Sequence, residues 1–216
     1  MSFDYFDELG DSIEGAGSME LHQEGTYVLE LTGAGSREYS GGSVCVETEF
    51  SVAAQEIPEK QRNGGAIFEG PKSGARLFAR HFLFILIDKN DTSKGFKVNS
   101  VGGRIFYNML RVLHGFSNKS DVSKAYPSDI TPNINEDGNI TNALEICDNF
   151  GSKIDMQAIG QNCKSVVAIQ INGQYKSNEI KNYKDLSSFE KKSLELFLTG
   201  GETPLESDQT DDNIPF

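Results

Sequence analysis

The sequence predicts a mainly β fold with added helices, built around one five-stranded barrel between residues 25 and 199. Five segments carry strand patterns, and the first three alternate apolar and polar side chains with a period of two. A helical pattern stands between the third and fourth segments, and Asn172-Gly173 joins the last two as a type I′ hairpin. We expect a flexible acidic arm over residues 1–24 and a disordered acidic tail over residues 200–216.

The first strand is expected from Gly25, with Tyr27, Leu29 and Leu31 on one face. The run Gly33-Ala34-Gly35 predicts a bulge or a sharp coil in a strongly curved strand. After a turn over residues 40–42, the second strand alternates again. One face carries Val44, Val46, Thr48, Phe50 and Val52, and the other carries Cys45, Glu47, Glu49 and Ser51.

Residues 54–74 are expected to form a loop that contains Arg62, Phe68 and Lys72. A loop of about 20 residues is long for a structureless connection, so we expect function or mobility there. In the third strand, Leu77, Ala79, His81 and Leu83 share the apolar face, where His81 is expected to be a core residue. The other face interleaves cations with aromatic rings, in the order Arg76, Phe78, Arg80 and Phe82.

From Leu83 to Ile87 the chain is apolar on both faces and is expected to be buried. Asn99 or Ser100 can cap a helix that ends near His114, with Gly115 as its stop. The expected core stripe of this helix is Ile105, Met109, Val112 and Phe116. Its polar stripe (Arg104, Asn108 and Arg111) is either a solvated face or a flank of a nucleic-acid path.

Residues 117–160 are expected to be an insertion, with a loop over residues 117–140 and a short helix capped by Thr141 or Asn142. The fourth strand is expected from Lys164 to Ile171, and the fifth over residues 174–184. Ser187 to Glu190 has capping-box spacing and predicts a final helix through Phe197.

The order of strand, strand, strand, helix, strand, strand is typical of the OB-fold barrel, which presents its second and third strands to oligonucleotides. Residues 74–78, the helix after them and residues 178–183 resemble a family of bacteriophage single-stranded DNA-binding proteins. The resemblance covers about residues 25–185 and implies an OB fold and cooperative, sequence-tolerant binding in phage replication or recombination. The N-terminal arm and the insertion have no counterpart in that family.

The C-terminal residues are Asp211, Asp212, Asn213, Ile214, Pro215 and Phe216. They resemble the tip of bacterial single-stranded DNA-binding proteins, an acidic run followed by Ile-Pro-Phe, although Asn213 stands where aspartate is usual. An anionic tail with an apolar end and a free carboxylate suits a basic-rimmed pocket on a partner. The resemblance implies that the tail recruits phage replication and recombination proteins and host proteins that read the host's own tip.

The net charge of −12 is unevenly distributed. Residues 1–25 and 193–216 contain no Lys or Arg, so all 20 basic residues lie in a body whose net charge is about +1. A near-neutral body can still carry one basic face for phosphates. Three widely spaced cysteines are expected to be reduced and buried. Without a signal peptide or a membrane-spanning run, we expect the cytoplasm of a bacterial host.

These observations predict a protein that coats single-stranded DNA, because cations bind phosphates and flat rings stack on exposed bases. The residues expected to contact DNA are Arg37, Tyr39, Arg62, Phe68, Lys72, Arg76, Phe78, Arg80, Phe82, Lys164, Tyr175, Lys176, Lys181, Tyr183 and Lys184. An RNA-binding or strand-annealing protein remains open, as does an adaptor without nucleic-acid affinity. We expect neither an enzyme nor a cofactor, and the pair Glu47 and Glu49 is only a weak signature for Mg²⁺.

Overall fold

A computed structural model describes residues 21–62, 66–70, 76–172 and 175–200. Most of the acidic arm, the tail after Gly200 and the hairpin turn at residues 173–174 therefore lie outside the described residues. In the described part, no helix is long and apolar enough to cross a membrane.

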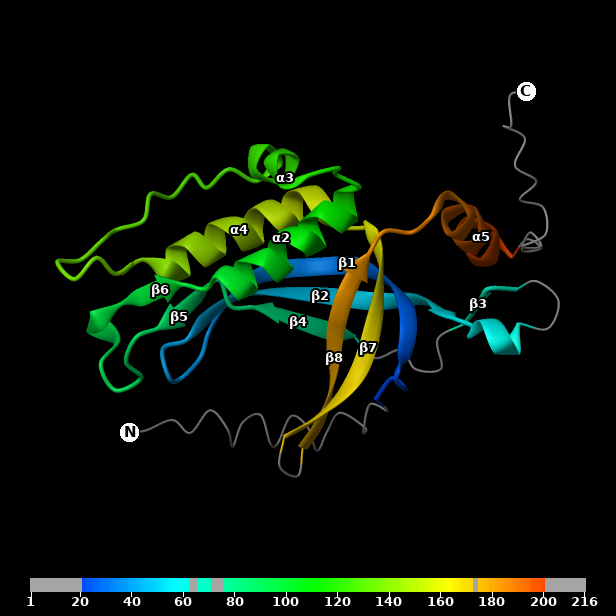
Figure 1. The fold of residues 1–216 in the computed structure, drawn as a ribbon, viewed down its shortest axis with the longest axis horizontal. Coiled ribbons are helices and arrows are strands. Elements are labelled where there is room, and N and C mark those ends of the chain that lie inside the picture. Colours follow the sequence, from blue (N-terminus) through cyan, green and yellow to red (C-terminus); the bar gives the residue numbers. More distant parts are fainter. Residues whose placement is uncertain (1–20, 63–65, 71–75, 173–174, 201–216) are drawn as a thin grey trace, which may run out of the picture.

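Six of the described strands form one antiparallel sheet, in which β1 lies between β2 and β7 (Figure 1). These strands are β1 (Gly25–Glu38), β2 (Val44–Glu56), β3 (Phe68–Glu69), β4 (Leu77–His81), β7 (Asn162–Asn172) and β8 (Tyr175–Lys184). The far edge of β2 pairs with β4 and β3, and β7 pairs with β8. The five expected strands are therefore β1, β2, β4, β7 and β8.

Short strands and helices complete the described chain. They are β5 (Phe84–Leu86) and β6 (Phe96–Val98), which pair with each other, and helices α2 (Ser100–His114), α3 (Lys119–Ala125), α4 (Ala143–Ala158) and α5 (Ser188–Thr199). The fold is thus mixed α/β, with more helix than the sequence predicted. No ladder joins β4 to β8 among the described residues, and closure of the sheet into a barrel stays a prediction.

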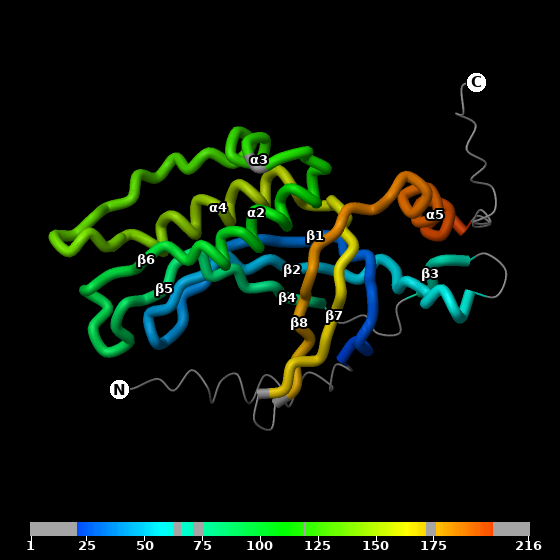
Figure 2. Tube along the Cα trace, viewed as in Figure 1, coloured from blue at the N-terminus to red at the C-terminus, as the bar shows by residue number. Residues whose placement is uncertain are grey.

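The main core lies between the sheet and the two helices α2 and α4, which run side by side in Figures 1 and 2. Phe106 of α2 meets Phe150 of α4 with ring centroids 5.7 Å apart. The expected irregularity in β1 is confirmed by a register shift between Leu31 and Gly33. A Cβ added to Gly151 of α4 would lie 2.6 Å from the carbonyl carbon of Gly35, so α4 can approach β1 this closely only because position 151 is glycine.

The expected caps of α2 and α5 are confirmed, whereas Asn142 stands at the start of α4 without a capping hydrogen bond from its side chain. The Asn99 side chain accepts a hydrogen bond from the Gly102 N–H at the start of α2, and Gly115 ends that helix in the left-handed conformation, at φ 65°. Ser187 and Glu190 form the expected capping box of α5. The three cysteines are free and buried, as expected.

Three expectations for the middle of the chain were wrong. The segment after Leu83 is only partly buried, because β5 pairs only with β6: Phe84 and Leu86 pack against the core, whereas Ile85 is exposed. Ile105 is 50% exposed, because the buried stripe of α2 is Phe106, Met109, Leu110, Val112 and Leu113. Residues 117–140 contain the helix α3 in addition to loop, and the expected short helix is the 16-residue α4.

The loop expected over residues 54–74 was also wrong in its boundaries. β2 continues to Glu56, a 3₁₀ turn follows at Glu59–Gln61, and β3 pairs back onto the end of β2. Burial explains this pairing, because a second apolar cluster forms between this end of the sheet and α5. Its buried members are Val28, Ala54, Ile67, Phe68, Leu186 and Leu194.

Candidate nucleic-acid interface

Strand β4 presents alternating side chains to opposite environments, as its sequence predicts. Leu77, Ala79 and His81 are buried, whereas Phe78 is 47% exposed and the following Phe82 is 37% exposed. His81 packs in the core, where its Nε2 lies 3.2 Å from the Thr48 Oγ1. Burial lowers the pKa of His81 to about 4, so the imidazole is neutral at physiological pH.

A groove lies between β4, which pairs with the outer side of β2, and β8, the strand at the opposite edge of the sheet. We call it the β4–β8 groove. It has a volume of about 540 Å³ and is lined on one side by residues 76–82 and on the other by residues 176–180. Leu21, Ile105, Gln170 and Tyr183 complete its lining. The exposed rings of Phe78 and Phe82 therefore border a groove rather than a flat surface.

The arginines beside these rings are paired with two carboxylates of β2. The Arg76 Nη1 lies 2.6 Å from the Glu49 Oε1, and the Arg80 Nε lies 3.2 Å from the Glu47 Oε2. Arg37 Nη1 donates to both oxygens of Glu47 at 3.2 Å. A phosphate that binds these arginines must therefore compete with protein carboxylates.

The register of the sheet explains the pairing, because Glu47 stands directly opposite Arg80 in the β2–β4 ladder. Sequence reasoning considered Glu47 and Glu49 only as a metal pair and missed this role. The signal was present: the same outward face carries glutamates on one strand and arginines on the next. Among the described residues, no group of three or more potential metal ligands comes together.

Tyr39 packs behind Phe82, which lines the groove, and supports its neighbours. Its ring centroid is 6.0 Å from that of Phe82, and the guanidinium carbons of Arg37 and Arg80 lie 5.4 and 5.9 Å from it. Burial and the neighbouring Cys45 raise the pKa of Tyr39 to about 12, which keeps the hydroxyl neutral. The ring is thus packed against two cations and Phe82, and it holds them in place.

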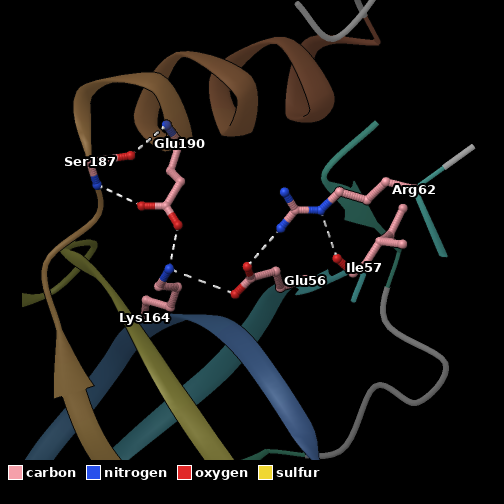
Figure 3. Close-up of polar contacts among 6 residues, drawn as sticks. All are labelled: Glu56, Ile57, Arg62, Lys164, Ser187 and Glu190. Carbon is pink, nitrogen blue, oxygen red and sulfur yellow. Dashed lines mark hydrogen bonds and ion pairs between the residues drawn. The ribbon is translucent and has the colours of Figure 1, made fainter. Parts of the chain in front are cut away.

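Two expected contact residues, Arg62 and Lys164, belong instead to a polar network beside α5 (Figure 3). Arg62 donates from Nη2 to the Glu56 Oε1 at 3.0 Å and from Nε to the carbonyl of Ile57 at 3.0 Å. Lys164 is paired with Glu190, and its Nζ lies 3.7 Å from the Glu56 Oε2. Lys164 thereby links β7 to β2 and α5, and Arg62 holds the 3₁₀ turn against the end of β2, while DNA contact by either cation stays a prediction.

Two rings expected to contact DNA, those of Phe68 and Tyr183, are buried in this structure. Phe68 is 3% exposed in the second apolar cluster, and Tyr183 is 5% exposed in the main core. A ring stacks on a base only if its face is accessible. Tyr183 lines the groove at its floor, where its ring centroid lies 6.2 Å from that of His81.

The remaining expected contacts fall into three groups. Lys176 lines the β4–β8 groove, Lys181 is paired with Glu179 at 3.0 Å, and Lys184 is exposed at the end of β8. The position of the Tyr175 side chain is not described. Lys72 and the tail residues Asp211, Asp212, Ile214, Pro215 and Phe216 lie outside the described residues.

No family model matches the chain, and no curated protein is similar enough to count as a match. What the groove can bind must therefore be worked out from its own side chains. Burial raises the pKa of the Cys147 and Cys163 thiols to about 12, so their thiolates are disfavoured as nucleophiles. The exposed rings and cations of the β4–β8 groove are instead suited to binding an anionic polymer that carries flat bases.

Proposed function

We propose that this chain is a single-stranded DNA-binding protein of the bacteriophage type, which coats exposed strands without sequence preference. The five strands β1, β2, β4, β7 and β8, with α2 between the third and the fourth, fit the OB fold. In that fold the second and third strands face the oligonucleotide, and here these strands are β2 and β4. The resemblance of residues 25–185 to phage proteins of this kind supports the same proposal.

The observation that carries the proposal is the accessible face of β4. Phe78 and Phe82 are four residues apart in the sequence, both are exposed, and they border a groove that also holds the exposed cation Lys176. Each base stacked on such a ring contributes about 1–3 kcal/mol. Stacking tolerates any base, because every base offers a flat face, and this accounts for binding without sequence preference.

The test is a titration of a fluorescent oligo-dT with the full chain and with the double variant Phe78→Ala, Phe82→Ala. We expect the double variant to lose at least about 30-fold in affinity, the effect of about 2 kcal/mol. Met156→Ala is the matched control, because Met156 is 75% exposed on α4 and does not line the groove. Equal affinities of the double variant and this control would contradict the proposed face.

The same titration separates the other functions that the sequence allows. Tighter binding of an RNA oligomer of equal length would favour an RNA-binding protein, since stacking and phosphate contacts serve both polymers. Binding of neither polymer would leave an adaptor that only presents its tail.

In the proposed function, the tail recruits phage replication and recombination proteins in the host cytoplasm, together with host proteins that recognise an acidic Ile-Pro-Phe end.

A further inference from the structure

A second groove adjoins the first along β8. It lies between α2 and β8, has a volume of about 600 Å³, and we call it the α2–β8 groove. Ile105, Glu179, Ile180 and Tyr183 line both grooves. The two grooves are therefore parts of one continuous depression that passes from β4 over β8 to α2.

The first turn of α2 is fixed against the end of β4, beside the exposed Phe82. A Cβ added to Gly102 would lie 2.0 Å from the carbonyl oxygen of Phe82, so only glycine permits this approach. The Asn99 Nδ2 donates to the same carbonyl at 2.8 Å. Arg104 and Ile105, one turn further on, are thereby held next to the β4–β8 groove.

The opposite wall is shaped by an irregularity in β8. The β7–β8 register shifts between Lys164 and Val166, and Asn182 has φ 56°, the one positive value of a non-glycine residue in the described chain. Such bulges redirect side chains. Here Tyr183 is buried while Asn182 stays exposed in the groove, and Asn108 of α2 donates to the Tyr183 carbonyl at 3.1 Å.

The charges of the α2–β8 groove single out Arg104. Arg111 is paired with Asp185 at 2.9 Å, and Lys181 is paired with Glu179. Arg104 is exposed and has no hydrogen bond or ion pair with any residue in the described ranges. It lies beside Ile105, which is 50% exposed. A cation beside exposed apolar surface repeats the combination found in the β4–β8 groove.

We propose that the α2–β8 groove binds the continuation of the DNA strand that occupies the β4–β8 groove. Arg104 contacts a phosphate, and Ile105 and Ile180 pack under a base. This inference rests on the proposed function, and it extends the binding path from one strand edge to the helix. It also assigns Arg104 a place on the nucleic-acid path.

The experiment compares two oligo-dT lengths, about 4 and about 16 nucleotides, the range of site sizes for one OB fold. The full chain carries Arg104→Ala, Ile105→Ala or, as a matched control, Lys124→Ala on α3. We expect Arg104→Ala to lose about fivefold on the long oligomer and less than about twofold on the short one. Its salt slope on the long oligomer should fall by about 0.7, the loss of one phosphate contact to a single strand.

The lengths distinguish the inference from the proposed function. If the unaltered chain binds both oligomers but Arg104→Ala behaves like Lys124→Ala on each, the extended path is wrong. An equal loss on both lengths would place Arg104 in the first groove and would overturn the path as well. Binding of neither oligomer by the unaltered chain would overturn the proposed function itself.

Discussion

Replacing Glu47 by Gln should tighten DNA binding. Its carboxylate accepts hydrogen bonds from Arg37 and Arg80, the two cations packed on Tyr39. Glutamine keeps the shape and one acceptor oxygen but removes the charge. In the bound state a phosphate would then meet guanidinium groups that no protein anion holds, and it would no longer be repelled by a neighbouring carboxylate.

The expected gain in DNA affinity follows from the two ion pairs of Glu47, with Arg37 and with Arg80. Pairs between exposed or partly exposed side chains contribute roughly 0.2–1 kcal/mol each. Removal of the competition at both arginines should therefore improve binding by up to about 2 kcal/mol, or about 30-fold. Glu49→Gln releases only Arg76, whose Nη1 lies 2.6 Å from the Glu49 Oε1. This variant should therefore improve DNA affinity by no more than about fivefold.

The assay is a fluorescence titration of oligo-dT at about 50 and about 200 mM salt, since phosphate contacts weaken with salt. Glu136→Gln is the control, because Glu136 is exposed, lines neither groove and gives the same change in net charge. Equal affinities of Glu47→Gln and Glu136→Gln would refute the competition. Weaker binding by Glu47→Gln would mean that Glu47 orients the arginines instead of competing for them.

Three further predictions concern the core, the network beside α5 and the tail. Tyr183→Phe should leave DNA affinity unchanged. Its free energy of unfolding in urea should be equal or up to about 1 kcal/mol higher, because the buried hydroxyl has no partner in the described chain. A loss of DNA affinity would mean that this ring belongs to the interface. Burial alone would raise the pKa of Glu190, but hydrogen bonds from Lys164 and the helix cap outweigh it, so the folded pKa lies below 4.5. The stability that Glu190 contributes should therefore be fully present above about pH 4.5 and disappear as the pH falls through the folded pKa, and a constant difference between the wild type and Glu190→Gln across that range would contradict this. Phe216→Ala should abolish capture of tail-reading partners and leave DNA affinity intact. Deletion of residues 202–216 should tighten DNA binding at low salt. Loss of partner capture and of DNA binding together would indicate misfolding.

The features that the sequence predicted correctly depend on short stretches of chain. The alternation along β4 follows from the period of a strand, and the ends of α2 follow from Asn99 and Gly115. The capping box that opens α5 is likewise readable within four residues. These signals concern one element at a time, and no distant contact is needed to interpret them.

The sequence did not predict which side chains are covered by other parts of the fold. Phe68 and Tyr183 carry the same ring chemistry as Phe78, but the second cluster and the bulge of β8 bury them. The sequence predicts Ile105 as a core residue, but the adjacent Phe106 faces the sheet and Ile105 is exposed. Burial of this kind is decided by tertiary packing, which periodicity in a single segment does not encode.

The distribution of ion pairs makes the salt dependence of binding informative about the whole site. Within the described chain, Lys176 and Arg104 are the cations lining the two grooves that make no ion pair, whereas Arg76 and Arg80 are held by glutamates. At about 0.7 per phosphate, two contacts predict a salt slope near 1.4. If the three arginines paired with β2 glutamates (Arg37, Arg76 and Arg80) exchanged those glutamates for phosphates, the slope would rise to about 3.5. A shallow slope with high affinity would mean that stacking on Phe78 and Phe82 provides most of the binding energy. A steep slope would mean that the carboxylates of β2 give way to phosphates when the strand binds.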